Sequence, residues 1–386
     1  MVRALARVNL AAIERNADRI RRELDPRVML CAVVKADGYG HGAVPAARAA
    51  LAGGASWLAV ATAVEAAELR AAGIEERILV MGAISYEELP LALAARADVV
   101  AGSERFVSEL AAAGTEERPV RVHVKLDTGM GRLGTRVRAE AIAVAEAVSA
   151  YPTLELAGAM THFATADDPD DEFLQLQLAR FAPFAAELRR RHPGILVHAA
   201  NSAATLTEPA SHFDLVRCGI ALYGLDPMNK SAPERGLEPA LELTSYVAAV
   251  KLAAAGDSAG YGRRFVATHD TWLATLPIGY ADGIRRAFTN NLDVLIGGQR
   301  RALVGAVSMD NITVEVESTG VDSPGTSPGG EAPVRLGARA TIIGTHGSER
   351  QSAEDLAARI GTINYEIVCG ISGRVPRAYH RDGVEQ

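Results

Sequence analysis

The most constraining feature of this sequence is a regular alternation of short apolar runs and longer stretches with helical spacing, from Val28 to about Gly224. The apolar runs are rich in Val, Ile and Leu, as strands are. The longer stretches place apolar residues three and four positions apart, with charges on the opposite face, as outer-layer helices require. We expect strands to begin at Val28, Trp57, Arg77, Ala97, Val120, Leu154, Ile195 and Asp214.

Eight such strand–helix units in roughly 200 residues predict an α/β protein with an N-terminal (β/α)8 barrel of the TIM type. An open, doubly wound sheet is the alternative. It suits about five or six units, and the G-x-G-x-x-G turn of a dinucleotide site is missing after the first strand. We expect the barrel domain to span residues 1–236, with the first few residues able to join the next domain.

After the barrel the helical spacing fades, and strand-like runs are separated by glycine-rich turns. This pattern predicts a mostly β C-terminal domain over residues 237–386. A segment dense in Pro, Gly and Ser at 318–333 is expected to be an exposed, mobile loop without chemistry.

Composition narrows the function. The chain has 386 residues and a formal net charge of −7, which disfavours binding to nucleic acid because such binding needs clustered cations. No apolar run reaches the length of a membrane span. The three cysteines, Cys31, Cys218 and Cys369, are far apart in apolar or strand-like surroundings. We interpret them as buried reduced thiols, which indicates a cytoplasmic protein.

In barrel enzymes the reactive residues follow the carboxyl ends of the strands. Lys35 ends the first apolar strand, where an ammonium is costly to desolvate and its pKa is easily lowered toward the neutral amine that forms a Schiff base. A lysine that only extends from a strand end into solvent is the alternative. The run Gly38-Tyr39-Gly40-His41-Gly42 favours the first interpretation, because a glycine-rich turn with an aromatic hydroxyl suits a cofactor that carries a phosphate.

Other polar residues follow later strands. Ser202 and the Gly219-Ile220 backbone lie after strands seven and eight, where barrels commonly bind phosphate. Arg217 must find an acceptor because it cannot lose its charge. The remaining candidates also have ordinary structural interpretations: His162 and His41 as packing residues, Lys125 and Asp127 as partners of Arg132, and Tyr261, Tyr280, Met309 and Asp310 as turn residues of the second domain.

The sequence shows no cluster with metal-ligand spacing, because neither His123 nor Cys31 has other candidate ligands at suitable positions. We therefore predict no catalytic metal.

The run Val34-Lys35-Ala36-Asp37-Gly38-Tyr39-Gly40-His41-Gly42 is similar to the lysine signature of the alanine racemases, which use pyridoxal 5'-phosphate (PLP). D-T-G-M-G-R-L-G, N-S-A-A-T, G-Y-G-R-R-F, P-I-G-Y-A-D-G and S-M-D-N match the same family in the same order. The resemblance implies a cytoplasmic isomerase that interconverts L- and D-alanine and supplies D-alanine for peptidoglycan. It also implies a homodimer with shared active sites and no role for nucleic acid or membrane.

The resemblance assigns roles by position. Lys35 would bind PLP and form an acid–base pair with Tyr261 of the partner subunit. The PLP phosphate would be held by Tyr39, Ser202, Gly219, Ile220 and Tyr365. Arg217 would face the pyridine nitrogen with support from His162, and Asn201 would contact the cofactor. The substrate carboxylate would be bound by Arg132 and the Met309 backbone. Lys125 matches a lysine that is carbamylated in some relatives and positions Arg132, while Tyr280 and Asp310 would have supporting roles along the substrate corridor.

Two positions depart from the family pattern: Ala306 stands where arginine is common, and Asn311 where glutamine is common. The missing arginine removes a polar contact from the expected substrate corridor but leaves the catalytic pair intact. Three alternatives stay open at this point. They are a racemase that also accepts serine, a PLP-binding protein without turnover, and a PLP decarboxylase, which would be expected to place a carboxylate at the pyridine nitrogen.

Overall fold

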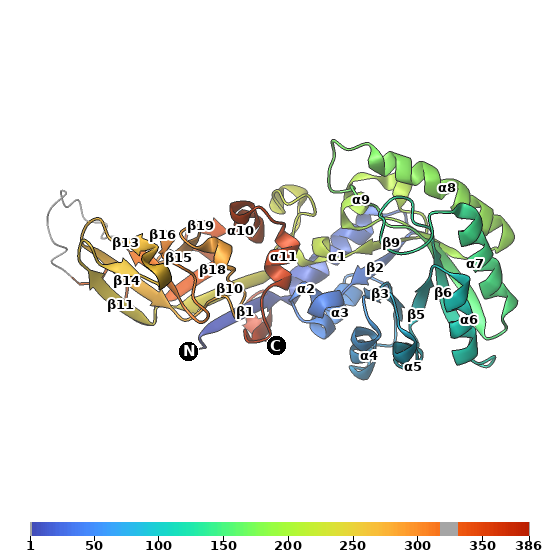
Figure 1. The fold of residues 1–386 in the computed structure, drawn as a ribbon, viewed down its shortest axis with the longest axis horizontal. Helices are drawn as coiled ribbons and strands as arrows, with labels where there is room; N and C mark the ends of the chain where they lie inside the picture. The colour runs from blue at the N-terminus through green and yellow to red at the C-terminus, as the bar shows by residue number, and fades with distance from the viewer. Residues whose placement is uncertain (1, 317–330, 386) are drawn as a thin grey trace. The chain divides into compact units, whose positions relative to one another are not determined.

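The computed structural model describes residues 2–316 and 331–385 and divides into two compact units, residues 11–238 and residues 1–10 with 239–386 (Figure 1). The loop expected at 318–333 falls, up to residue 330, outside the described residues. Among the helices that the structure describes, none is both long and apolar enough to cross a membrane.

Residues 11–238, all of them described, contain eight strands that pair only in parallel, in the order β8-β7-β6-β5-β4-β3-β2-β9. The end strands β8 and β9 are joined by backbone hydrogen bonds from the amides of Asp214 and Arg217 to the carbonyls of Val197 and Ala200. The predicted (β/α)8 barrel is therefore confirmed. Its strands are β2 (Met29–Val33), β3 (Trp57–Val60), β4 (Arg77–Val80), β5 (Asp98–Ala101), β6 (Val120–Lys125), β7 (Leu154–Met160), β8 (Leu196–His198) and β9 (Leu215–Cys218).

The helices of this unit lie outside the strands, as their apolar stripes predict (Figure 1). Helix α8, for example, buries Leu178, Phe181, Phe184 and Leu188 on one face. The helices are α1 (Leu10–Glu23), α2 (Lys35–Tyr39), α3 (Ala43–Ala52), α4 (Ala63–Ala71), α5 (Leu89–Ala94), α6 (Glu104–Ala113), α7 (Arg138–Ala150), α8 (Phe173–Arg191) and α9 (Ser202–Thr207).

The described part of the second unit is mostly β, as predicted, and contains an 11-stranded mixed sheet in which β1 lies between antiparallel β10 and parallel β20. Strands such as β17 alternate buried and partly exposed residues, so one face of the sheet packs against the core. The elements are β1 (Ala4–Asn9), β10 (Leu241–Tyr246), β11 (Ala249–Ala253), β12 (Ser258–Ala259), β13 (Phe265–Val266), β14 (Thr271–Leu276), β15 (Asp293–Ile296), β16 (Gln299–Val304), β17 (Ile312–Val316), β18 (Arg339–His346), β19 (Glu349–Gln351), α10 (Ala353–Ile360), α11 (Asn364–Cys369), β20 (Arg377–Arg381) and β21 (Val384–Glu385).

The expectation that all three thiols are buried is wrong for one of them. Cys31 and Cys218 are buried, and burial raises the pKa of both thiols, which makes them poor nucleophiles. Cys369 is exposed. It ends α11 directly after the buried pair Ile367 and Val368, so the helical rotation of about 100° per residue turns its side chain away from the core.

Asn16 is a buried polar residue that ties α1 to the end of the barrel chain. Its Nδ2 donates to the carbonyls of Leu222 and Glu238 at 3.0 and 2.9 Å, and its Oδ1 accepts the amide of Glu238 at 2.9 Å. One side chain thus satisfies three backbone groups that water reaches poorly.

We predict that Asn16→Ala lowers the free energy of unfolding of the barrel unit by about 2–5 kcal/mol, because several buried backbone groups lose their partners. The matched control is Asp18→Ala, which removes an exposed ion pair with Arg22 and should cost about 0.5 kcal/mol or less. Urea unfolding can be followed in a Trp272→Phe background, where Trp57 is the only tryptophan left and reports the barrel. Equal midpoints for the two variants would contradict the prediction.

Candidate active site

Polar and ionisable residues lie at or just after the carboxyl ends of five barrel strands. Lys35 follows β2, Lys125 is the last residue of β6, and Arg217 lies in β9. His162 follows β7, and the pair Asn201-Ser202 follows β8. Because the carboxyl ends of parallel strands meet at one end of a barrel, these residues share one mouth.

The environment of His162 shows how closely the cations gather. Burial lowers the pKa of His162 well below its usual value, and the charges of Arg217, Lys125, Arg132 and Lys35 lower it further. The imidazole is therefore neutral and can accept a hydrogen bond. Its Nδ1 lies 3.2 Å from Nη2 of Arg217. His162 is thus a neutral acceptor among positive charges.

The chain leaves Lys35 through a turn of left-handed backbone. The φ angle is +51° at Ala36 and Asp37 and +53° at Tyr39, although none of these residues is glycine. Such a conformation costs about 1–2 kcal/mol per residue and is maintained only where neighbouring contacts impose it. Strain of this kind clusters at functional sites, and here it directly follows the predicted reactive lysine.

Glu65 holds this turn in place. Its Oε1 accepts the amide of Ala36 at 2.6 Å, and its Oε2 accepts the amides of Ala61 and Thr62 at 2.8 and 3.1 Å. The Thr62 hydroxyl in turn accepts the Glu65 amide, so the same residue completes the capping box of α4. One carboxylate therefore joins the turn after β2 to the start of the next helix.

A cradle of hydroxyl and backbone groups forms where β9 ends. A Cβ atom on Gly219 would lie 2.3 Å from Oη of Tyr39, so a residue with a side chain could not replace this glycine without displacing the tyrosine. The Oγ of Ser202 accepts the Gly219 amide at 2.9 Å. Ile220 follows directly and is buried. Hydroxyls that converge on the backbone at this position of a barrel suit a phosphate group.

His41 packs behind this cradle. Its ring is fully buried and stacks on Tyr223 with a centroid separation of 4.5 Å. Its Nδ1 lies 2.9 Å from the carbonyl of Tyr39. The Tyr223 hydroxyl donates to the carbonyl of Val33 at 3.0 Å, which connects the cradle to the strand that precedes Lys35.

Arg217 is a fully buried cation with acceptors on most of its donor groups. Its Nη1 lies 2.7 Å from Nδ1 of His198, and its Nη2 donates to the carbonyls of Thr161 and Ala199 at 2.9 and 2.8 Å. Burial lowers the pKa of Arg217 to about 10, which leaves it charged at neutral pH. Its Nε is buried and has no hydrogen-bond partner within the residues that the structure describes. That atom can donate to a bound acceptor.

Lys125 lies near the charges of two arginines and forms no ion pair with the described residues. Burial, followed by the charges of Arg217 and Arg132, lowers the pKa of Lys125 to about 8. The interpretation that Asp127 pairs with Arg132 is wrong. The Asp127 carboxylate accepts the amides of Gly129 and Gly131 and pairs with Arg136 at 3.3 Å, because the tight turn after β6 folds back onto it. Arg132 is exposed.

Five predicted site residues belong to the second unit, which is described separately from the barrel: Tyr261, Tyr280, Met309, Asp310 and Tyr365. Tyr261 stands between Gly260 and Gly262 on an exposed turn, where it is 73% accessible. Tyr280 and Met309 are also exposed. Tyr365 lies in α11. Tyr261, Tyr280 and Met309 are thus accessible to a ligand or to another chain.

The loops that carry Tyr280 and Met309 are held together by their backbones. The amide of Tyr280 donates to the carbonyl of Ser308 at 2.9 Å, and the amide of Ala281 donates to the carbonyl of Met309 at 3.0 Å. A Cβ atom on Gly279 would lie 2.4 Å from the Met309 oxygen, so this approach requires glycine. The position of Met309 is thus set from the Tyr280 loop.

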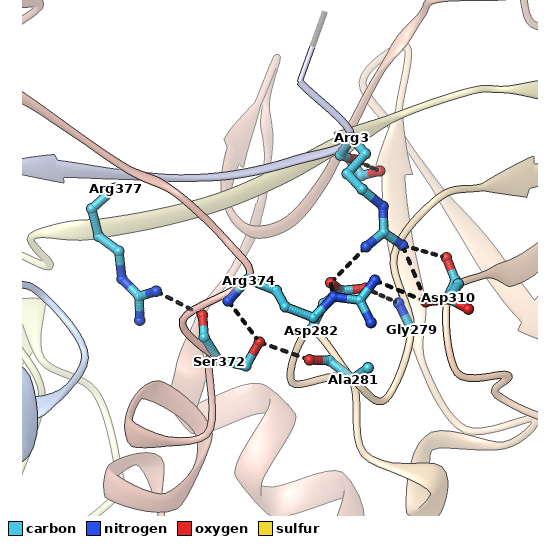
Figure 2. Close-up of polar contacts among 9 residues, drawn as sticks. Arg3, Gly279, Ala281, Asp282, Asp310, Ser372, Arg374 and Arg377 are labelled. Carbon is cyan, nitrogen blue, oxygen red and sulfur yellow. Dashed lines mark hydrogen bonds and ion pairs between the residues drawn. The ribbon is translucent and has the colours of Figure 1, made fainter.

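A buried carboxylate reinforces these loops. Figure 2 shows Arg3 and Arg374 converging on Asp282, with Nη1 of Arg3 at 2.9 Å and Nε of Arg374 at 3.4 Å from Oδ1. The other oxygen of Asp282 accepts the Gly279 amide at 2.9 Å. Asp310 joins the same cluster through Nη2 of Arg374 at 2.8 Å. The cluster fixes the 279–282 and 308–310 loops relative to each other.

Sequence reasoning missed Glu65, His198 and the pair formed by His123 and Asp98. The T-x-x-E capping pattern could have identified Glu65, and strand alternation places His123 on the same face as Lys125. A further signal lies in composition: only four of the 40 basic residues are lysines, Lys35, Lys125, Lys230 and Lys251, and two of these lie at the barrel mouth. In the described chain, no three His, Cys, Asp or Glu side chains form a group able to hold a metal ion.

Fold and site together define a barrel enzyme with a lysine at the end of its first strand and a β-rich C-terminal domain. Family models named "Alanine racemase, N-terminal domain" and "Alanine racemase, C-terminal domain" match residues 8–227 and 240–379. An alanine racemase of Frankia casuarinae is 43% identical, covering 90% of this chain and 89% of that protein. The chain belongs to the alanine racemase family.

Solved structures agree with this conclusion. The crystal structure of alanine racemase from E. faecalis is 35% identical, has a TM-score of 0.90, and covers 98% of each chain. The alanine racemase of Bacillus anthracis, solved with bound L-Ala-P, is 37% identical with a TM-score of 0.89, and the match covers 100% of this chain and 97% of that one.

We predict that Glu65→Gln destabilises the barrel unit by about 1–3 kcal/mol, because an amide offers one acceptor oxygen and turns its NH2 group toward a backbone N–H. Glu68→Gln is the control, since Glu68 is an exposed residue of the same helix. Urea unfolding monitored through Trp57 in the Trp272→Phe background measures both variants. Wild-type stability in Glu65→Gln would show that the carboxylate does not hold the turn.

Proposed function

We propose that this chain interconverts L- and D-alanine with PLP bound to Lys35. The observation that carries the proposal is that one barrel mouth holds both Lys35, which follows β2, and the buried Nε of Arg217, which has no hydrogen-bond partner among the described residues. The match to alanine racemases over both domains gives the reaction. We further propose that the protein acts in the cytoplasm as a homodimer and supplies D-alanine for peptidoglycan.

The residues present fit PLP. The Arg217 Nε–H is a buried donor that a pyridine nitrogen would satisfy. The hydroxyls of Tyr39 and Ser202 beside the Gly219 backbone suit the phosphate, and we propose that Ile220 and Tyr365 complete that site. Asn201, whose Oδ1 caps α9 by accepting the Ala204 amide, would contact the cofactor from the end of β8. When bound, PLP withdraws electrons from the substrate and makes its Cα–H bond acidic.

Arg217 selects among the reactions that PLP permits. Its guanidinium has only donor groups and stays charged, so it favours a ring nitrogen that is an acceptor and carries no proton. Arg217 would thereby weaken electron withdrawal by the bound cofactor, which would favour return of a proton to Cα over transamination. A decarboxylase or aminotransferase would be expected to place a carboxylate there. The buried arginine therefore supports racemisation.

Racemisation needs one group to remove the α-proton and another to return a proton on the opposite face. We propose Lys35 and Tyr261 of the partner subunit as this pair. The high exposure of Tyr261 in the single chain supports a role that requires another chain to cover it. His162 would orient Arg217 and Tyr261, since a neutral imidazole can accept from one and contact the other.

The substrate carboxylate needs a cation and a backbone donor. We propose Arg132 and the Met309 amide for this role, with Lys125 positioning Arg132 and with Tyr280 and Asp310 supporting the Met309 loop. Activity toward serine as well as alanine is the alternative within the same reaction class. Incubation with individual L-amino acids, followed by chiral analysis, tests the reaction and its substrate range together.

We predict that Lys35→Ala abolishes racemisation and releases PLP during gel filtration, because the covalent attachment point is gone. Lys230→Ala, at an exposed lysine of the same unit, should retain both cofactor and activity. Borohydride reduction of the wild type followed by peptide mass spectrometry should find the pyridoxyl group on Lys35. Modification at Lys125, Lys230 or Lys251 instead would reassign the cofactor site.

We also predict that two inactive variants, Lys35→Ala and Tyr261→Phe, restore activity when mixed and allowed to exchange subunits. In a mixed C2 dimer with shared sites, one site carries both lesions and the other carries none. Random exchange of equal amounts makes about half of the dimers mixed, so about a quarter of all sites should recover.

Native mass spectrometry verifies the exchange in this experiment, and each variant incubated alone is the control. Activity at background after verified exchange would mean that both groups come from one chain. That outcome would remove the shared-site proposal and leave the PLP assignment unaffected.

A further inference from the structure

A chain of four polar side chains crosses the interior of the barrel beneath the site. Asp98 begins β5, His123 lies in β6, His198 ends β8 and Arg217 lies in β9. All four are buried. Nη1 of Arg217 lies 2.7 Å from Nδ1 of His198, Nε2 of His198 lies 2.8 Å from Nδ1 of His123, and Nε2 of His123 lies 3.2 Å from Oδ2 of Asp98.

The Arg217 guanidinium determines the direction of every hydrogen bond in this series of four side chains. A guanidinium can only donate, so Nδ1 of His198 must accept and its proton must be on Nε2. That N–H donates to Nδ1 of His123, which places the His123 proton on Nε2, facing the Asp98 carboxylate. The two imidazoles are then neutral and share one tautomer. Burial, together with the charge of Arg217, lowers the pKa of His198 well below its usual value, in agreement with a neutral ring.

The two histidines meet across an intervening strand because of one glycine. Strand β7 lies between β6 and β8, and Gly158 of β7 is in register with His123 on one side and Leu196 on the other. A Cβ atom at Gly158 would lie 2.3 Å from Nδ1 of His123. A side chain there would therefore occupy the space in which the imidazole–imidazole hydrogen bond forms.

We propose that Asp98, His123 and His198 form a relay that positions Arg217 and strengthens its donation to the ring nitrogen of PLP. This inference rests on the proposed function, because it assumes that Nε of Arg217 contacts that nitrogen. The relay holds one end of the guanidinium, and the Thr161 and Ala199 carbonyls hold Nη2, so Nε is left to face the cofactor.

The relay also compensates charge. A buried guanidinium is destabilising unless acceptors and a counter-charge offset its desolvation, and hydrogen bonds in series polarise one another. Asp98 supplies the negative end, where Nε of Arg121 also lies 3.2 Å from Oδ2. Trp57 packs edge-on against His123 with a centroid separation of 5.9 Å. Arg217, Asp98 and Arg121 are thus the charged groups that face the two imidazoles through the relay, and the charge of Lys125 also acts on His198.

The first test reads the tautomers directly. The 15N spectrum of PLP-loaded protein labelled with [15N]histidine should show His123 and His198 with the proton on Nε2 and with Nδ1 unprotonated. His41 is an internal reference of the opposite type, because its Nδ1 faces the carbonyls of Gly38 and Tyr39 and must carry the proton. Signals are assigned from single-histidine substitutions. Protonation of His123 or His198 on Nδ1 would overturn the relay.

The second test separates positioning of Arg217 from a general structural role. The affinity of the protein for PLP is compared with its affinity for the analogue that has C–H in place of the ring nitrogen. Both ligands use the same phosphate and lysine contacts, so a general loss of structure weakens both. A loss of Arg217 donation weakens only PLP. The ratio of the two dissociation constants is therefore the readout, and it does not depend on catalysis.

Asp98→Asn keeps an acceptor oxygen for His123 but removes the charge, and Gly158→Ala inserts a methyl group against His123. We expect the preference for PLP over the analogue to fall about threefold in Asp98→Asn and about tenfold in Gly158→Ala. His192→Gln, at a histidine outside the relay, should leave the ratio unchanged. Thermal unfolding of each variant checks that the fold is retained.

The outcomes distinguish the two proposals. If the wild-type protein shows no preference for PLP over the analogue, Arg217 does not contact the ring nitrogen, and the proposed cofactor geometry fails first. If the wild type shows the preference and both variants keep it within about twofold, the relay has no influence on Arg217 and the inference is overturned. A reduced ratio in Asp98→Asn, which alters no packing volume, supports the relay even if Gly158→Ala does not fold.

Discussion

The burial of one positive charge organises the barrel unit. Arg217 lies inside a sheet of almost wholly apolar strands, where an unpaired guanidinium would be strongly destabilising. Its acceptors come from segments far apart in sequence: backbone carbonyls after β7 and β8, His162 and His198. Only Nε lacks such a partner in the described structure. The strands that close the barrel thus also determine that Nε is the donor of Arg217 that remains for a ligand.

A second constraint acts on Lys35, which lies at the same barrel mouth as Arg217. The turn after Lys35 is strained at three non-glycine residues, and the strain is maintained by contacts from neighbouring segments, Glu65 foremost among them. A lysine on a flexible loop would sample many positions. A lysine at the start of a strained turn is held in one position, which reduces the entropy lost when a ligand binds to it.

The second unit also holds its predicted site residues in fixed positions, but through different contacts. The loops bearing Tyr280 and Met309 are exposed, yet their backbones are joined directly and are supported by the buried Asp282 carboxylate. Exposed residues on a rigid base are suited to contact something outside the chain, because little conformational freedom is lost when they do. Ala306 and Asn311, which depart from the family pattern, lie beside these loops in sequence. They change the side chains at these two positions but leave the backbone contacts and the Asp282 carboxylate in place.

The sequence by itself determined the barrel, the β-rich second unit and the residues at the strand ends. The apolar repeats of strands (period 2) and helices (period 3.6) can be recognised in short stretches of sequence. Because the carboxyl ends of parallel strands meet at one end of a barrel, these repeats also locate the site. Contacts across non-adjacent strands were decided only by tertiary structure. His123 and His198 meet because Gly158 leaves space between them, and Arg217 of β9 reaches past β8 to the carbonyl of Thr161 after β7. No periodicity encodes such contacts, since they depend on the register and closure of the whole sheet.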